Sequence, residues 1–66
     1  MKITINGKDQ DLDAPASITS LLATLGLADK PVVVELNKKA LFPREYTSSQ
    51  LEDGDQVEII AIAAGG

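Results

Sequence analysis

LEDGDQVEIIAI, residues 51–62, combines a turn with a strand, and the rest of the chain can be placed around it. Glu52–Asp55 is a polar turn in which Gly54 supplies a backbone conformation that other residues rarely adopt. From Gln56 to Ile62 the side chains alternate between the two faces of an expected strand. One face carries Val57, Ile59 and Ala61, and the other carries Glu58, Ile60 and Ile62.

The second face of this strand is expected to remain outside the core. One helix is expected in the chain, and one helix covers one face of a small sheet. If it covers the face of Val57, then Ile60 and Ile62 point outward and can form a docking surface, joined by Val33 or Lys8 from neighbouring strands. Single exposed apolar side chains are also ordinary in proteins, so both interpretations stay open.

The first residues predict a β-hairpin. Residues 1–5 alternate apolar and polar side chains, as in a strand with one buried face. Asn6-Gly7 favours a type I′ turn, because both central residues of that turn have positive φ. A second strand then runs from Lys8 to about Asp13, at an edge of the sheet. The first and last strands are the most apolar alternating segments and are expected to pair at its centre.

A single amphipathic helix is expected next. Ser17 is its N-cap candidate, because its hydroxyl can accept a hydrogen bond from an early backbone N–H. Gly26 ends the helix at a position that favours the left-handed conformation, and Leu27 can fold back on the last turn. The apolar stripe of the helix consists of Ile18, Leu21, Leu22 and Leu25.

The middle of the chain predicts two more strands and a loop. Residues 32–36 are β-branched on both faces, as in a largely buried strand. Residues 37–39 are expected to form a turn and residues 40–42 a short return strand. Residues 44–50 are expected to be irregular or a single helical turn, with Leu51 anchored in the core. The element order is that of an α+β fold with the helix across one face of the sheet.

Composition excludes several classes of function. The chain has 66 residues and a net charge of −4, which argues against nucleic-acid binding. It has no Cys and no His, so disulfides, thiol nucleophiles and zinc sites are excluded. No signal peptide or membrane-spanning segment is expected, and the expected compartment is the cytoplasm.

Two further groups of side chains predict no site. Asp9, Asp11 and Asp13 have the spacing of a calcium loop, but Ala14 and Ser20 stand where such a loop needs Gly and Glu. No metal site is therefore expected. Ser17 and Tyr46 are also not expected to act as nucleophiles, because there is no His or Cys to activate them.

The C-terminus is the remaining candidate for chemistry. Residues 1–62 are expected to form one domain, and residues 63–66, AAGG, a flexible tail. Four extended residues project about 14 Å and none has a side chain larger than a methyl group, so the tail can enter a narrow channel. Its carboxylate is anionic at neutral pH and can attack an activated phosphate. A frayed end without function is the alternative, and Gly-Gly alone does not decide between them.

Five segments together carry a resemblance to a known family: MKITING (1–7), VELN (34–37), PREY (43–46), LEDGDQVEII (51–60) and GG (65–66). Through them, and over its full length, the chain resembles the thiamine-biosynthesis sulfur-carrier (ThiS) family, whose members are ubiquitin-like β-grasp proteins. The resemblance implies a mixed sheet of four to five strands with one helix across one face. Ala63-Ala64 departs from the family pattern, in which a bulkier residue and another Gly often precede the final glycines.

The resemblance implies a sulfur carrier that is acted on by enzymes and is not itself an enzyme. An adenylating enzyme similar to ubiquitin-activating enzymes would use ATP and Mg to convert the Gly66 carboxylate to an acyl-adenylate. A persulfide donor, such as a cysteine desulfurase, would then supply sulfur in place of AMP. The Gly66 thiocarboxylate would give that sulfur to thiazole synthase for the thiazole phosphate of thiamine. No cofactor would be bound by the chain itself.

The resemblance also assigns roles to individual residues. Gly65 would let Gly66 thread a channel, with Ala63 and Ala64 contributing to tail recognition. Ile60 and Ile62 would dock the partners, with possible charge contacts from Glu52, Asp53 and Asp55. Two alternatives remain. One is the small subunit of a molybdopterin synthase, and the other is a ubiquitin-like protein modifier or binding module.

Overall fold

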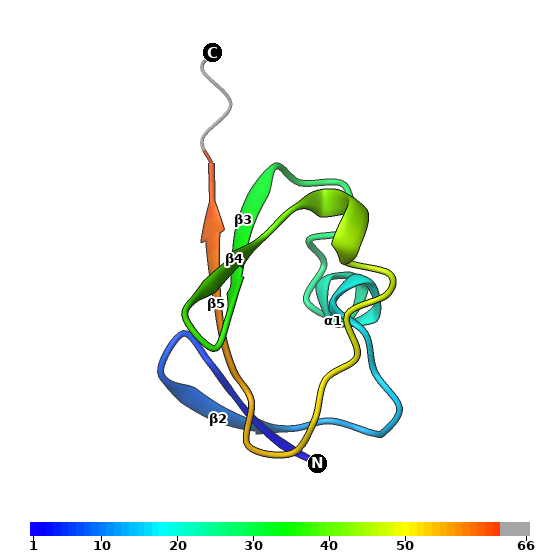
Figure 1. Cartoon of the computed structure of the whole chain (residues 1–66), viewed down its shortest axis with the longest axis vertical. Coiled ribbons are helices and arrows are strands. Elements are labelled where there is room, and N and C mark those ends of the chain that lie inside the picture. Colours follow the sequence, from blue (N-terminus) through cyan, green and yellow to red (C-terminus); the bar gives the residue numbers. More distant parts are fainter. Residues whose placement is uncertain (63–66) are drawn as a thin grey trace.

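The computed structural model describes residues 1–62 as a five-stranded mixed sheet with one helix across one face (Figure 1). The strand order is β2-β1-β5-β3-β4. The first and last strands pair in parallel at the centre, as predicted, and the other neighbours are antiparallel. The elements are β1 (Lys2–Ile5), β2 (Lys8–Asp11), α1 (Ile18–Thr24), β3 (Val32–Leu36), β4 (Lys39–Leu41), the 3-10 turn η1 (Pro43–Glu45) and β5 (Gln56–Ala61).

Both ends of α1 are formed by the residues that the sequence predicts. The Ser17 hydroxyl accepts a hydrogen bond from the Ser20 backbone N–H at 3.1 Å. At the other end Gly26 has φ +74°, and the Leu27 N–H donates to the Leu22 carbonyl at 2.7 Å. This is the hydrogen bond of a Schellman cap, which turns the chain back toward β3.

The core is aliphatic and lies between α1 and the sheet. Leu51 is buried and anchors the polar loop before β5, as predicted. Because all the buried side chains are aliphatic, with Tyr46 packed only at the margin of the core, stability depends on many small packing contacts. The buried residues are Ile3, Ile5, Ile18, Leu21, Leu22, Val34, Leu51, Val57 and Ile59.

Several strand boundaries differ from the prediction by one or two residues. The turn before β4 contains only Asn37 and Lys38, with φ +50° and +69°, so β4 begins at Lys39, which the sequence had placed in the turn. A two-residue turn with both φ positive matches the twist of the strands it joins. β2 ends at Asp11, although Leu12 still exchanges hydrogen bonds with Met1. β5 ends at Ala61, one residue earlier than predicted.

Two asparagines hold β5 from opposite sides. The Asn6 side chain accepts from the Ile59 N–H at 2.8 Å and donates to the Ile59 carbonyl at 3.1 Å, so it replaces the strand that ends at Ile5. On the other side the Asn37 side chain accepts from the Gln56 N–H at 2.9 Å. Both asparagines have positive φ, a conformation that Asn tolerates well. These bonds fix the strand that leads to the C-terminus.

Asn6→Gly is expected to lower the free energy of unfolding by about 1–3 kcal/mol, because it leaves the Ile59 N–H and carbonyl without partners while the positive φ stays unstrained. The midpoint of urea unfolding measures the loss. Lys38→Gly is the matched control, since Lys38 also has positive φ but its side chain is exposed. Equal midpoints for Asn6→Gly and the wild type would show that the Asn6 bonds contribute nothing.

Candidate functional site

The outer face of β5 carries the two isoleucines that the sequence places there. Ile60 is 52% exposed and Ile62 is 51% exposed, whereas Val57 and Ile59 are buried on the opposite face. Val33 of β3 is directly opposite Ile60, and directly paired residues share a face. We call Val33, Ile60 and Ile62 the outer patch. The prediction that these isoleucines point away from the helix is confirmed.

Lys8 does not join the outer patch, and the prediction that it might was wrong. Lys8 is directly opposite Ile5, whose side chain is buried on the helix face of the sheet. Because the Asn6-Gly7 turn has two residues, it pairs Ile5 with Lys8 and sets both on the same face. The contribution of Lys8 therefore lies on the other side of the sheet.

Ala61 is exposed, although the sequence groups it with the buried Val57 and Ile59. It lines a pocket of about 380 Å³ between the β1–β2 hairpin and the end of α1, which we call the hairpin pocket. The apolar lining of the pocket is formed by Ile5, Leu25, Leu27 and Ile59. Its polar lining consists of Asn6, Lys8 and Gln10. The sequence signal for this pocket is the pair of polar residues on the helix face of β2, where a covered strand would be apolar.

The acidic turn before β5 lies at the opposite end of this strand from Ile62 (Figure 1). Two of its carboxylates hold the fold together. Asp53 Oδ1 accepts from the Lys2 backbone N–H at 2.6 Å. Asp55 accepts from the Asn37 side chain at 3.0 Å and from the Glu52 N–H at 2.8 Å. The structure thus separates Glu52, Asp53 and Asp55 from the outer patch.

The predicted tail begins where the sheet ends. Ile62, the last described residue, donates its backbone N–H to the Pro31 carbonyl at 2.9 Å. This bond continues the β3–β5 register and fixes the point from which the chain leaves the sheet. Ala63, Ala64, Gly65 and Gly66 lie outside the described residues, so the predictions for the tail remain predictions.

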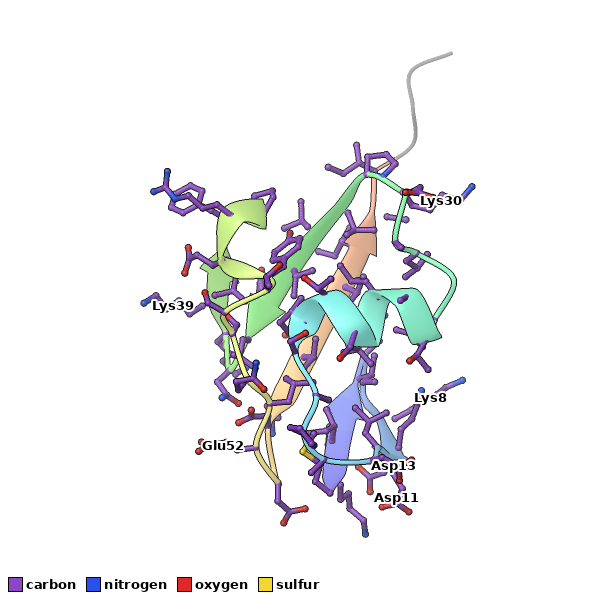
Figure 2. The ribbon with its side chains drawn as sticks, turned by 90° about the vertical axis from the view of Figure 1, so that its right-hand side faces the viewer. Lys8, Asp11, Asp13, Lys30, Lys39 and Glu52 are labelled. Carbon is purple, nitrogen blue, oxygen red and sulfur yellow. The ribbon has the colours of Figure 1, made fainter. Side chains whose placement is uncertain are left out.

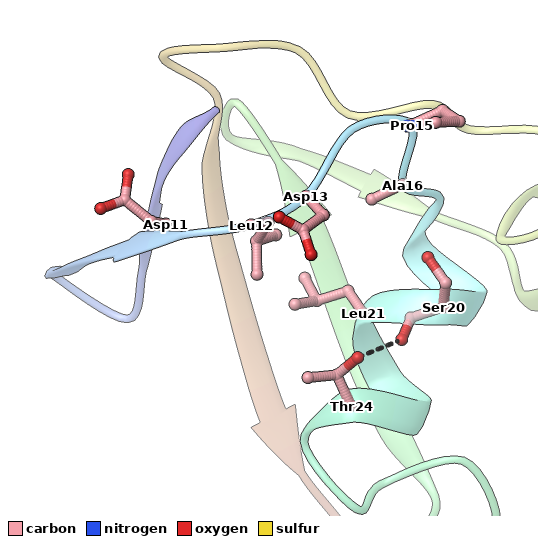
Figure 3. Close-up of a pocket in the computed structure, with 8 residues that line it drawn as sticks. All are labelled: Asp11, Leu12, Asp13, Pro15, Ala16, Ser20, Leu21 and Thr24. Atoms are coloured by element: carbon pink, nitrogen blue, oxygen red, sulfur yellow. Dashed lines mark hydrogen bonds between the residues drawn. The ribbon is translucent and has the colours of Figure 1, made fainter.

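Two of the three aspartates with calcium-loop spacing lie at an acidic hollow beside α1 (Figure 3). Asp11 and Asp13 line it together with Ser20 and Thr24, and the Thr24 hydroxyl donates to the Ser20 carbonyl at 3.0 Å. Asp9 is instead bound by the Thr4 hydroxyl at 3.0 Å. Within residues 1–62, no group of three or more acidic, His or Cys side chains is placed to hold a metal ion.

The structure of residues 1–62 contains no candidate for a membrane-spanning helix. The α-helix described in residues 1–62, α1, has 7 residues, and no helix there is long and apolar enough to span a bilayer.

Comparison with known proteins gives a match over the whole chain. The ThiS family model matches residues 3–66. The sulfur carrier protein ThiS of Bacillus subtilis is 35% identical over 65 residues, covering 97% of this chain and 98% of the relative. The crystal structure of a thiamine biosynthesis protein (ThiS) from Geobacter metallireducens superposes with a TM-score of 0.84 at 35% identity, with both chains fully covered.

A longer protein contains a segment that is similar to the whole of this chain. The thiazole synthase of Paramagnetospirillum magneticum is 35% identical over 66 residues, which is all of this chain but 20% of that protein. The chain thus spans about a fifth of the length of this relative.

A five-stranded mixed sheet crossed by one helix, with the C-terminal strand at its centre, defines the class of ubiquitin-like β-grasp proteins. Within that class, the chain belongs to the ThiS family.

Proposed function

We propose that this protein is a sulfur carrier for thiamine biosynthesis and that its reactive group is the Gly66 carboxylate. The observation that carries the proposal is the family match, which runs through the final Gly-Gly to residue 66. Relatives of nearly the same length are named sulfur carrier protein ThiS. The chain has no Cys and no His, so its own side chains offer neither a thiol nor an imidazole for this chemistry.

The proposed reaction proceeds in three steps on the terminal carboxyl. The Gly66 carboxylate attacks the α-phosphate of ATP, which forms an acyl-adenylate and releases pyrophosphate. A persulfide sulfur then attacks the acyl carbon and AMP leaves. A thiol of the sulfur-supplying enzyme finally cleaves the resulting S–S bond, forms a disulfide on that enzyme and leaves the Gly66 thiocarboxylate. ATP and Mg are held by the activating enzyme, which is E1-like, and the chemistry takes place in the cytoplasm.

Thiazole synthase is the proposed acceptor of the sulfur. Support comes from the thiazole synthases of Paramagnetospirillum magneticum and Magnetococcus marinus, in which a segment similar to all of this chain forms part of the protein. A carrier-like segment inside a synthase indicates that the two act on each other at close range. Gly65 and the two small alanines before it allow the tail to enter the active site of the synthase.

The outer patch is the proposed docking surface for the activating enzyme. It lies on β5 and the residue that follows it, directly before the tail, and it combines two exposed isoleucines with the half-buried Val33 of the neighbouring strand β3. An apolar surface this close to the reactive end orients the tail toward the partner. The acidic turn lies at the other end of β5 from the outer patch. A partner docked on the patch would therefore have to extend along the whole strand to contact Glu52.

Ile60→Asp is expected to reduce the rate of adenylation about tenfold or more when the carrier concentration is below saturation. The reason is that the substitution inserts a charge into an apolar interface. The rate of pyrophosphate release measures the effect. Ile60→Leu should keep the wild-type rate. Ala14→Asp, which adds the same charge on an exposed loop, is the matched control. A wild-type rate for Ile60→Asp would exclude the outer patch as the docking surface.

Reconstitution tests the proposed function and separates it from its alternatives. The chain is mixed with the adenylating enzyme, ATP, a persulfide source and thiazole synthase with its small-molecule substrates, and thiazole phosphate is measured. We expect product only when the chain is present. Sulfur transfer to a molybdopterin synthase in place of thiazole synthase would favour the first alternative. Attachment of the chain to lysines of other proteins would favour the modifier.

A further inference from the structure

The two sides of β5 differ in how far they are paired. Residues 56, 58, 60 and 62 direct their backbone groups toward β3, as the Ile62 bond to Pro31 shows. The alternate residues face β1: Asn6 donates its N–H to the Val57 carbonyl at 2.9 Å, and its side chain pairs with Ile59. The same alternation directs the N–H and carbonyl of Ala61 to the β1 side. β1 does not extend as far as Ala61, because it ends at Ile5 and the chain then turns into β2.

The hairpin pocket lies directly beside this open edge. Ala61 forms part of its wall, and its apolar lining consists of aliphatic side chains from the sheet and of Leu25 and Leu27, which directly follow α1. A strand edge next to an apolar pocket is the combination that recognises extended peptides, because the backbone supplies hydrogen bonds and the pocket supplies side-chain specificity.

The charge of the hairpin pocket indicates which kind of peptide segment would bind there. Among residues 1–62, Lys8 is the only charged side chain that lines the hairpin pocket, in a chain with a net charge of −4. Figure 2 shows Lys8 beside the helix, on the opposite side of the molecule from Lys39. A segment with a carboxylate that reaches Lys8 and an aliphatic side chain that enters the pocket would complement both features.

We propose that thiazole synthase adds an extended segment to β5 at Ala61, with an aliphatic side chain in the hairpin pocket and an acidic side chain at Lys8. This inference rests on the proposed function, since the synthase is the partner that must hold the residues next to Ala61 during sulfur transfer. The added segment would continue the sheet where β1 stops and would align the tail. The outer patch, on the opposite face, would remain available to the activating enzyme.

Amide hydrogen exchange tests the strand addition directly. In ¹⁵N-labelled carrier mixed with unlabelled thiazole synthase, the Ala61 N–H should exchange about tenfold or more slowly than in the free carrier. The Ile62 N–H, already bonded to Pro31, is the internal reference and should change little. Unchanged exchange at Ala61 in a formed complex would overturn the proposal. Protection of Ala61 already in the free carrier would also overturn it, because a second copy or another part of the chain would then occupy the edge.

Charge reversal tests the pocket independently of the backbone. Lys8→Glu should weaken binding to thiazole synthase about tenfold or more, because it sets two carboxylates against each other. Lys39→Glu makes the same change in net charge on β4 and should stay within about twofold of the wild type. Equal effects of the two variants would overturn the proposal. Failure to form any complex, or to transfer sulfur in it, would instead contradict the proposed function itself.

Discussion

Deletion of Gly66 is expected to lower ATP–pyrophosphate exchange by the adenylating enzyme at least about 100-fold. The shortened chain ends in the Gly65 carboxylate, which is set back by about 3.5 Å, one residue of extended chain. Misplacement of a reacting group by about 1 Å already costs about a hundredfold in rate. The exchange assay reports the first chemical step and needs no sulfur donor.

Two controls make the deletion informative. The described residues, 1–62, are unchanged in this variant, so its thermal unfolding should match that of the wild type. Ala64→Gly changes the tail without shortening it and should retain most of the exchange activity. An active deletion variant would show that the terminal carboxylate is not the activated group.

The second prediction concerns the free energy of unfolding. Ile3 on β1 is fully buried, and Ile3→Ala is expected to cost about 2–5 kcal/mol through lost burial and the cavity that remains. A domain of this size is stable by roughly 3–10 kcal/mol in total, so a large part of the population should unfold at physiological temperature. Circular dichroism during urea unfolding measures the change.

Ile60→Ala is the matched control for the core, because it removes the same atoms from an exposed position of the same sheet. Its cost should be well below that of Ile3→Ala. Comparable losses for the two variants would contradict the assignment of Ile3 to the core and Ile60 to the surface.

Local signals in the sequence predict most of the fold. The cap residues Ser17 and Gly26 act within a few residues of themselves, so their roles follow from sequence alone. The alternation in β5 also predicts which isoleucines stay exposed. The position of Lys8 follows from the two-residue Asn6-Gly7 turn, which pairs Lys8 with the buried Ile5 and so sets it on the helix face, away from the outer patch.

Contacts between distant residues were not predictable in this way. Asn6 reads as a turn residue, and its bonds to Ile59 join positions 53 residues apart. The role of Asp53 depends on the Lys2 backbone, 51 residues away. The hairpin pocket has a partial signal in the polar side chains on the helix face of β2, but its apolar lining is brought together only by packing. The contacts of Asn6 and Asp53 depend on how the elements pack and on no local pattern.

The central claim is that this chain carries sulfur on its C-terminal carboxyl. Intact-mass spectrometry of the full chain tests it after incubation with the adenylating enzyme, ATP and a persulfide source. The account predicts a mass gain equal to one sulfur replacing one oxygen, located by fragmentation at Gly66 and absent without ATP. An unchanged mass, with both enzymes shown to be active, would contradict it.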